Sequence, residues 1–506
     1  MAREPFFGLK GRALTWAITL CTASCYLLYG YDQGIMGSII NTDYFLDAVG
    51  ISVSDADTLS TVVSIYDVGC MAGCLTAAIV GGQLGRKKMI FVGCIVMCIG
   101  SAIQCSSYSV GQLIAGRVIA GLGNGFNTGS VPTWISETSK AKSRGQMVST
   151  QMSIAAFGIV IAYWMNYGFF HLTGQIVWRF PIAFQIAFAI PTILLIPFLP
   201  ESPRFNYAKG REAQADEALA ALKNAPLESE FVQAEKKSIM EAIELEDHLG
   251  EFSWKSVFWD TSGQKIHIRM LLVVVIQMLQ ELPGLNMVFY YSSFIFITIG
   301  IAEKTSLVLG GVTSICFWLG SIFGIFLIDR VGRKNLLHAG TIPSLITYAV
   351  YIPMIKNGGQ SQLWVAFAFT CVICFAYGYS WLPIPWVLGP ELLPVRYRHV
   401  GAGLNAFSNW TFTFIIVKVG PIGLTNIHWK LYVIFLVFTI CQLVVVWAFY
   451  PETKGLTLEE IDTLFVKDTD VVQKISAKGQ AVRILEDKNG VITSSSDSSY
   501  AEKTAA

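Results

Sequence analysis

Charged side chains are scarce in this chain of 506 residues. Asp, Glu, Lys and Arg make up 14% of it, whereas soluble domains carry about a quarter. The two signs balance, with 36 Lys and Arg against 35 Asp and Glu, so no one-signed field attracts nucleic acid and no such partner is expected. Hydrophobic residues make up 53%, and the mean hydropathy is +0.53. These residues are too many for one buried core, so some of them must face a lipid bilayer.

Residue types that build catalytic or metal sites are also poorly represented. The six histidines are scattered and no Ser, His and Asp set stands out, so we do not expect an enzyme. The 11 cysteines lie almost wholly within apolar runs, where a thiolate is costly. Pairs such as Cys21 and Cys25 have a metal-ligand spacing, but no histidine lies beside them. We interpret the cysteines as packing residues and expect neither a metal nor a cofactor.

Long apolar runs recur twelve times, each of about 20 residues, the length that crosses ~30 Å of hydrocarbon. Runs this long are helices, because the strands of a membrane barrel are about ten residues long and alternate. The sequence therefore predicts an all-α membrane protein with twelve transmembrane helices. They lie at 13–40, 58–80, 89–105, 110–131, 147–170, 181–199, 268–299, 307–328, 336–355, 363–388, 400–419 and 431–449.

Composition divides the chain into five parts. Residues 1–12 precede the first span, 13–200 hold six spans, 201–266 carry alternating charges, 267–450 hold six more spans, and 451–506 turn polar. The charged segment predicts cytoplasmic amphipathic helices that join two six-helix halves, either as a plain link or as a latch. The polar tail is expected to be cytoplasmic and mostly disordered.

The short loops predict which way the chain faces. Lys and Arg cluster in alternate loops, for example at 86–88 and 140–144, whereas 41–57 contains four Asp and no Lys or Arg. The positive-inside rule places the basic loops in the cytoplasm, and with them both termini. The first span is too long for a signal-peptide core, so we expect it to stay in the mature protein. The prediction is a multi-pass protein of the plasma membrane.

Glycines recur every fourth residue in the fourth span, at Gly121, Gly125 and Gly129. This spacing predicts a helix face that another helix approaches closely. The same stretch superficially resembles a nucleotide-binding loop, but no strand precedes it. We therefore expect a packing role and no nucleotide.

An internal repeat relates the two halves. Three unrelated patterns recur in the same order and at nearly the same offset, which favours duplication over chance. The matches are 85–87 with 332–334, Glu137 and Arg144 with Glu391 and Arg398, and 200–201 with 451–452. The chain is therefore predicted to consist of two homologous six-helix halves, as in transporters built from parallel repeats.

Several longer motifs accompany the repeat: GYDQG at 30–34, QMLQELPGLN at 277–286, DRVGRK at 329–334, PIPW at 383–386, PESPR at 200–204 and PETKG at 451–455. Together they resemble the sugar porter family of the major facilitator superfamily, in particular its fungal proton-coupled monosaccharide transporters. The resemblance covers nearly the whole chain, from Tyr29 to Gly455. It implies the major facilitator fold and a secondary active transporter that imports a hexose or pentose with a proton by alternating access. We expect this transporter to be a monomer.

A sugar carries many hydroxyl groups, so its carrier needs side chains that both donate and accept hydrogen bonds inside an apolar tunnel. Three amides within ten residues fit this need and lie beside a helix-breaking Pro-Gly pair. Each amide alone has an alternative role in bonding neighbouring helices. The resemblance adds further residues, and the predicted binding set is Gln151, Gln277, Gln280, Glu281, Asn286, Tyr290, Tyr291, Trp386 and Asn409.

Two departures from the family pattern bear on the substrate. Phe317 lies where many members have Asn, which removes one hydrogen bond to a sugar, and Glu281 replaces a frequent Gln. They keep other functions open: a proton-coupled carrier of glycerol, another polyol or a sugar acid, or a facilitative carrier. A non-transporting sugar sensor is a further alternative, which the short polar tail after Gly455 disfavours.

Charged loop residues of both halves resemble the family's cytoplasmic salt-bridge network, which would lock the outward-facing state. Topology alone explains the Lys and Arg but not the matched carboxylates. Gly82 stands where the first-half loop usually has Asp, so one ion pair is expected to be missing. The predicted network is Arg86, Glu137, Arg144, Glu201, Arg204, Asp329, Arg333, Glu391, Arg398 and Glu452.

Ionisable residues inside membrane helices are expensive and by default functional. Asp32 lies where proton-coupled members of the family have Asp, and Arg117 matches the arginine expected to face it. Movement of Arg117 away from Asp32 would favour uptake of a proton, so this pair is predicted to couple a proton to transport. A structural ion pair is the alternative, and Asp67 and Glu281 are rival proton sites.

Overall fold

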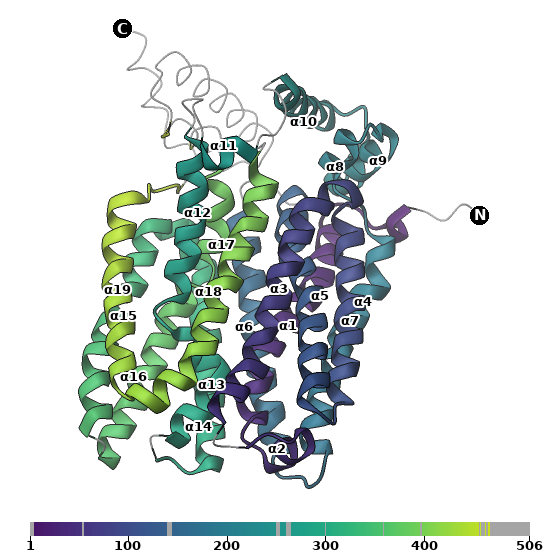
Figure 1. Cartoon of the computed structure of the whole chain (residues 1–506). Helices are drawn as coiled ribbons and strands as arrows, with labels where there is room; N and C mark the ends of the chain where they lie inside the picture. Colours follow the sequence, from purple (N-terminus) through teal and green to yellow (C-terminus); the bar gives the residue numbers. More distant parts are fainter. Residues whose placement is uncertain are drawn as a thin grey trace.

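The structure is a computed structural model in which every regular element of the described residues is a helix. The long helices run side by side in one bundle, with the purple and blue first half beside the green and yellow second half (Figure 1). The described residues are 5–52, 55–138, 144–248, 254–259, 265–298, 300–357, 359–394, 397–454, 456, 461 and 464–465. Most of the tail predicted to be disordered therefore lies outside the described residues.

Six long helices form the first half. Three short helices lie near their ends: η1 (Pro5–Gly8), α2 (Asp43–Val49) and η3 (Ile196–Phe198). The long helices are α1 (Gly11–Ile39), α3 (Ala56–Leu84), α4 (Arg86–Cys105), α5 (Val110–Thr138), α6 (Arg144–Phe169) and α7 (Ile176–Leu195).

Six membrane-crossing segments also form the second half, and two of them consist of two helices separated by a break. One consists of α12 (Ile266–Glu281) and α13 (Leu285–Thr298), and the other of α16 (Gln360–Tyr379) and α17 (Ile384–Glu391). The continuous crossings are α14 (Glu303–Val331), α15 (Arg333–Asn357), α18 (Arg398–Ile427) and α19 (Lys430–Phe449). Twelve crossings in two halves agree with the predicted fold class.

Four helices connect the halves along the chain and lie at one end of the bundle, which we call the linker end (Figure 1). They are α8 (Pro203–Ala208), α9 (Glu212–Lys223), α10 (Glu230–His248) and α11 (Trp254–Phe258). The first three share a small core that includes Tyr207, Leu219 and Val232, and Lys236 of α10 pairs with Asp216 of α9 at 2.9 Å. Since α9 also contacts α1, this part of the linker is packed onto the first half.

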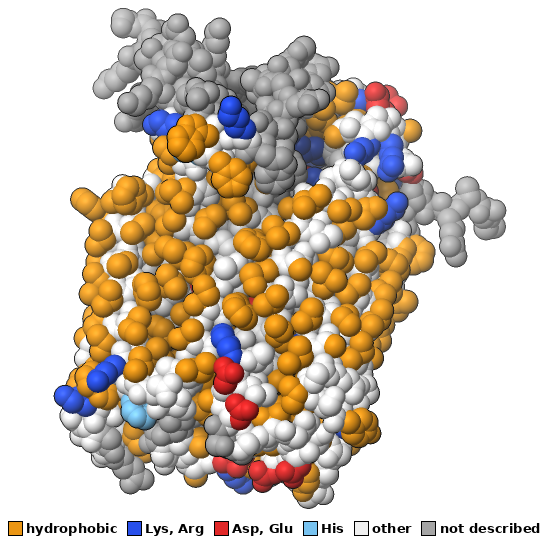
Figure 2. All heavy atoms as spheres, viewed as in Figure 1, with side chains coloured by type: hydrophobic (Ala, Val, Ile, Leu, Met, Phe, Trp, Pro, Cys, Tyr) orange, Lys and Arg blue, Asp and Glu red, His pale blue; other side chains and the backbone are white. Residues whose placement is uncertain are grey.

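The sides of the bundle are apolar. Figure 2 shows hydrophobic side chains spread over them, with most charged side chains near the two ends. Ten helical segments of the described chain are long and apolar enough to cross a membrane, and large side chains such as Trp16, Ile79 and Leu194 are exposed on them. The crossings α5 and α15 fall outside this group although they lie in the same bundle, because both carry polar residues, such as Arg117 and Asn124 in α5 and Thr341 and Ser344 in α15.

Glycines set the contact between α3 and α5. A Cβ added at Gly121 would lie 2.1 Å from the carbonyl oxygen of Tyr66, and one added at Gly125 would lie 2.3 Å from that of Cys70. Only glycine lets two helix backbones approach this closely. The predicted close approach is confirmed at these two positions, whereas the nearest neighbour of a Cβ at Gly129 lies 3.1 Å away.

The predicted helix break separates α12 from α13. Gly284 has a φ of +83°, a left-handed conformation, and a Cβ there would collide with the ring of Phe435. The break leaves carbonyl oxygens without helical donors, which is costly inside a membrane. Side chains of three other helices donate to them: Gln442 to Leu279, Tyr377 to Gln280 and Tyr348 to Pro283.

Three helix pairs provide most of the contact between the halves: α3 with α18, α6 with α14 and α1 with α13. Toward the linker end, a Cβ added at Gly145 of α6 would lie 3.1 Å from a carboxylate oxygen of Asp329 on α14. Toward the other end, Tyr163 of α6 donates a 2.5 Å hydrogen bond to the backbone oxygen of Phe289 on α13. The halves thus touch on both sides of the middle of the bundle.

Candidate functional site

A cavity of about 390 Å³ lies between the two halves, at the level where α12 gives way to α13. Both halves line it, the first through α1 and α6 and the second through α12, α13, α14 and α16. The lining residues are Tyr29, Gln33, Ala155, Ala156, Ile159, Gln280, Glu281, Asn286, Phe289, Phe317, Tyr377 and Leu382.

Asn409 of α18 lies within hydrogen-bonding distance of three polar residues of α12. Its Nδ2 lies 3.0 Å from Oε1 of Gln277, 3.5 Å from Oε1 of Gln280 and 2.7 Å from Oε1 of Glu281. Asn286 donates to the other carboxylate oxygen of Glu281 from the far side of the helix break. The break therefore lets residues of α12 and α13 meet around one carboxylate, which a continuous helix would hold farther apart.

This arrangement leaves hydrogen-bonding capacity for a ligand. The Nε2 group of Gln277 is buried and has no partner among the described residues, and the contact between Asn409 and Gln280 is at the limit of hydrogen-bond length. Of the predicted binding residues, Gln280, Glu281 and Asn286 line the cavity, and Gln277 and Asn409 are bonded to this group. A few polar side chains grouped in an otherwise apolar cavity suit a small polyhydroxyl solute.

The other predicted binding residues lie outside the cavity lining. Gln151 donates to the hydroxyl of Thr22 on α1 at 3.0 Å, a bond between neighbouring helices. Tyr291 donates to the backbone oxygen of Val417 at 3.1 Å. Trp386 is buried in α17, and Tyr290 meets Asp67 of the first half. Binding roles for Gln151, Tyr290, Tyr291 and Trp386 stay predictions.

Several lining residues were not predicted from the sequence. Gln33 belongs to the GYDQG motif and bonds Tyr29 one helical turn earlier at 3.1 Å, so helical spacing from the motif would have indicated both. Phe289 lies three residues after Asn286 on the same face of α13. Tyr377 carried no such signal, because its approach to Gln280 depends on the packing of α16.

Asp32 and Arg117 form a fully buried ion pair within the first half. Nη1 of Arg117 lies 3.1 Å from each carboxylate oxygen of Asp32, and both side chains are 0% exposed. The Tyr66 ring lies 4.5 Å from the guanidinium carbon, and Nη2 of Arg117 donates to the backbone oxygen of Val63 at 2.9 Å. The structure thus brings together the two residues that the sequence predicted to face each other.

In the second half, the predicted linker-end network centres on Arg333. Its guanidinium lies 3.1 Å from Asp329 and 3.1 Å from Glu391. Glu452 accepts hydrogen bonds from the backbone N–H groups of Arg333 and Lys334 at 2.9 and 3.0 Å. The carboxylate of Glu452 therefore sits at the start of α15, where the helix dipole favours negative charge.

The first half repeats this arrangement with one partner fewer. Arg86 pairs with Glu137 at 2.8 Å, and Glu201 accepts from the backbone N–H of Lys87 at 3.2 Å. Burial raises the pKa of Glu201 above its usual value. A Cβ added at Gly82, which corresponds to Asp329, would meet nothing within 4 Å.

The remaining members of the predicted network are Arg204, which lies on α8, and Arg144 and Arg398, whose side chains lie outside the described residues. A gating role for the whole set stays a prediction.

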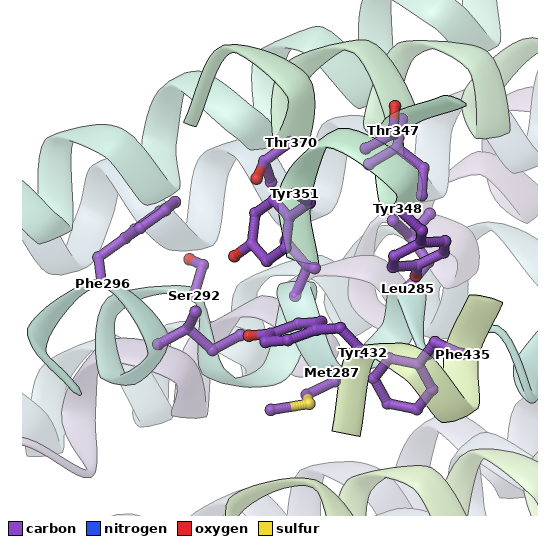
Figure 3. Close-up of a pocket in the computed structure, with 14 residues that line it drawn as sticks. Leu285, Met287, Ser292, Phe296, Thr347, Tyr348, Tyr351, Thr370, Tyr432 and Phe435 are labelled. Carbon is purple, nitrogen blue, oxygen red and sulfur yellow. The ribbon is translucent and has the colours of Figure 1, made fainter. Parts of the chain in front are cut away.

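A second cavity of about 490 Å³ lies inside the second half and is lined from α13, α15, α16 and α19 (Figure 3). Tyr348, Tyr351, Tyr432 and Phe435 form much of its wall. The described lining residues carry no charge, include no member of the predicted binding set and all belong to the second half. We therefore assign the candidate site to the cavity between the halves.

The sequence model of a family described as "Sugar (and other) transporter" matches residues 18–465 of the chain. The chain belongs to this family. It is a multi-pass membrane transporter and not an enzyme, as the predicted family membership implied.

Fungal members of the sugar transporter family are similar to the chain over most of its length. The sugar transporter STL1 of Saccharomyces cerevisiae is 33% identical over 483 residues, which cover 92% of this chain and 84% of that protein. The MFS-type transporter oryC of Aspergillus oryzae is 33% identical over 471 residues, covering 92% and 87%. The low-affinity glucose transporter of Kluyveromyces lactis is 31% identical over 87% of this chain and 80% of that protein.

Solved structures share the fold. The proton:xylose symporter XylE matches with a TM-score of 0.77 at 21% identity, over 89% of this chain and 99% of that chain. An inward-open structure of XylE from E. coli matches with a TM-score of 0.69 at the same identity. These matches place the chain in the major facilitator fold.

Proposed function

We propose that this transporter imports a monosaccharide, a hexose or a pentose, together with a proton by alternating access. The observation that carries the proposal is the ion pair of Asp32 and Arg117, both fully buried. Buried ion pairs are costly, and charges inside membrane helices mark ion and proton pathways. A proton on Asp32 would cancel its charge and release Arg117, which is a change that a transport cycle can use.

The polar group around Glu281 supports a sugar as the substrate. Amides both donate and accept hydrogen bonds, as hydroxyl groups do, and Gln280 and Asn286 present amides to the cavity. Among relatives, the Kluyveromyces lactis protein is named a glucose transporter and XylE a proton:xylose symporter. Those names support a sugar here, and the second supports a proton as the coupling ion. We propose that no cofactor takes part.

We further propose that the linker end faces the cytoplasm and that the membrane is the plasma membrane. Lys and Arg gather at the linker end, at 86–88 and 333–334, whereas Asp43, Asp47 and Asp57 lie at the opposite end. The positive-inside rule then puts both termini in the cytoplasm. A single chain holds the whole cavity, so we propose that it works as a monomer.

The test uses the full-length chain in liposomes with an inward proton gradient. We expect labelled glucose or xylose to accumulate, the outer medium to become alkaline, and a protonophore to abolish accumulation. Asp32→Asn should lose accumulation while counterflow exchange persists, and Asp43→Asn, an exposed carboxyl on α2, serves as the matched control. If the protonophore does not reduce uptake, symport is wrong and the protein is a facilitative carrier.

A polyol such as glycerol is the second candidate substrate. The rings of Phe289 and Phe317 lie 4.3 Å apart at the cavity wall, where they narrow it and offer no hydrogen bond. A competition panel of hexoses, pentoses, glycerol and uronic acids decides between the candidates. If glycerol saturates the carrier while glucose and xylose neither compete nor enter, the monosaccharide proposal is wrong.

A further inference from the structure

Three carboxyl side chains of the described residues lie buried inside the bundle, and Arg117 is the cation that pairs with one of them; the other fully buried arginine, Arg269, lies against Leu392 and Phe465. Asp32 and Asp67 are 0% exposed and Glu281 is 3% exposed. Arg117, also 0% exposed, pairs with Asp32. A carboxylate without a counter-ion is expensive in a membrane interior, so the charge of Arg117 is enough for one ionised carboxyl at a time. Asp67 is therefore held as a neutral acid while Asp32 occupies Arg117.

Asp67 is poorly satisfied by its surroundings. Its Oδ2 atom is buried and has no hydrogen-bond partner among the described residues. Its Oδ1 atom lies 3.4 Å from the hydroxyl of Tyr290, which is at the long end for such a bond. A structural carboxylate normally accepts several short hydrogen bonds, whereas a carboxyl that changes charge needs room for a second arrangement.

Arg117 already touches the turn of α3 that carries Asp67. Its Nη2 donates to the backbone oxygen of Val63 at 2.9 Å, and in an α-helix this oxygen accepts the N–H of the residue four positions later, Asp67. The Nε group of Arg117 is buried and has no partner among the described residues. The guanidinium thus pairs with Asp32 while it also contacts the helical turn that carries Asp67, and its Nε donor is still free.

We infer that Asp67 is a second proton-binding carboxyl of the transport cycle, which alternates with Asp32 as the ion-pair partner of Arg117. The inference rests on the proposed proton coupling. When the Asp32 carboxylate binds a proton, it becomes neutral and the guanidinium moves to Asp67. Asp67 then releases its own proton and becomes the carboxylate of the pair. One proton enters Asp32 and one leaves Asp67, so the three groups together are neutral both before and after the exchange.

The exchange reaches the second half through Tyr290. This residue lies on α13, which also brings Asn286 and Phe289 to the cavity. Hydrogen bonds to a charged acceptor are shorter and roughly twice as strong as those between neutral groups. An ionised Asp67 therefore holds α13 against α3, and a neutral Asp67 loosens this contact between the halves.

Other titratable groups near Asp67 come from each element packed around it. They are Tyr66 and Cys70 on α3 itself, Asp32 on α1, Arg117 on α5, Glu281 on α12, and Tyr290 and Tyr291 on α13. Helix α18 adds Trp410, which does not titrate, against Tyr66, and farther along α3 its Lys418 is already paired with Asp57 at 2.7 Å. Arg117 is the sole cation of this group, so it alone compensates a charge on Asp67.

The transport test compares Asp67→Asn with Asp67→Glu in liposomes that hold the full-length chain. Asp67→Asn should reduce proton-driven accumulation about tenfold or more and flatten its pH profile, while counterflow exchange persists. Asp67→Glu keeps a carboxyl and should restore accumulation to within about threefold of the wild type. Ser64→Ala, one turn earlier on α3 with a buried hydroxyl, controls for a mere packing change and should keep the wild-type pH profile.

Infrared difference spectra of the purified chain test the exchange itself. The wild type should show protonated-carboxyl absorption from both Asp67 and Glu281, and Asp67→Asn should remove the Asp67 component. Asp32→Asn should remove the same component, because Arg117 then moves to Asp67 and ionises it. Protonated-carboxyl absorption that Asp67→Asn does not reduce, or that Asp32→Asn leaves unchanged, overturns the exchange.

The two proposals fail in different ways. If a protonophore does not reduce uptake by the wild type, symport is ruled out, and with it the coupling role of Asp67. If a protonophore does reduce wild-type uptake, but Asp67→Asn has the same pH profile of uptake as the wild type, the Asp67 inference alone is wrong. Loss of counterflow in Asp67→Asn without rescue by Asp67→Glu also overturns it, because Asp67 would then be structural.

Discussion

A single amide determines how much hydrogen bonding the central cavity offers to a substrate. Asn409 has two N–H donors on Nδ2 but three acceptors around it, at 2.7, 3.0 and 3.5 Å. The two short contacts, to Glu281 and Gln277, use both donors. The Oε1 atom of Gln280 is then the acceptor left for a ligand hydroxyl, and Gln280 is also the one of these three amides that lines the cavity.

Gln280→Ala should therefore weaken sugar binding. Loss of a buried hydrogen bond costs about 1–3 kcal/mol, which corresponds to a roughly 5- to 150-fold higher Kd. Gln151→Ala is the matched control, because Gln151 bonds Thr22 outside the cavity and its loss should change the Kd less than about twofold. Equilibrium binding to the purified chain measures both. An equal loss in Gln151→Ala would restore the predicted binding role of that residue.

Helical elements were predictable because their signals are local. Apolar runs located the twelve crossings, and the Pro-Gly pair at 283–284 predicted the break between α12 and α13. The donors that stabilise this break were not predictable, because Tyr348, Tyr377 and Gln442 come from helices far along the chain. For the same reason, the amides of α12 could be predicted as a group, but the bond of Gln151 to α1 could not.

At the scale of helix packing, Gly125→Val should destabilise the first half. A Cβ at this position would lie 2.3 Å from the carbonyl oxygen of Cys70, and two further methyl groups would push α5 away from α3. Overpacking of this kind costs about 1–3 kcal/mol, so the purified variant should melt at a lower temperature. Gly111→Val, on the same helix with nothing within 4 Å, is the control. Equal melting temperatures for the two variants would contradict close packing of α3 and α5.

The two halves of the molecule repeat the same arrangement of charged residues at the linker end, but they form different numbers of ion pairs there. In both halves, a left-handed glycine turns one helix into the next: Gly85 with φ +91° and Gly332 with φ +100°. Arg333 then meets two carboxylates, whereas Arg86 forms one ion pair among the described residues, with Glu137. The sequence predicted this difference from Gly82. The approach of α6 to Asp329 across the halves could not be predicted, since no local pattern encodes it.

Gly82→Asp should make the linker end symmetrical and harder to open. The introduced carboxylate would stand four residues before Arg86, as Asp329 stands before Arg333, and the space around Gly82 is open. Since one exposed ion pair contributes roughly 0.5–1 kcal/mol, turnover in liposomes should fall about two- to fivefold while the Kd for the substrate stays unchanged. Gly82→Asn has nearly the same size without the charge and should turn over as fast as the wild type. High salt should also restore the rate of Gly82→Asp, because ions screen the added pair. If Gly82→Asn is slowed equally, or if salt has no effect, the linker-end charges do not control opening of the transporter.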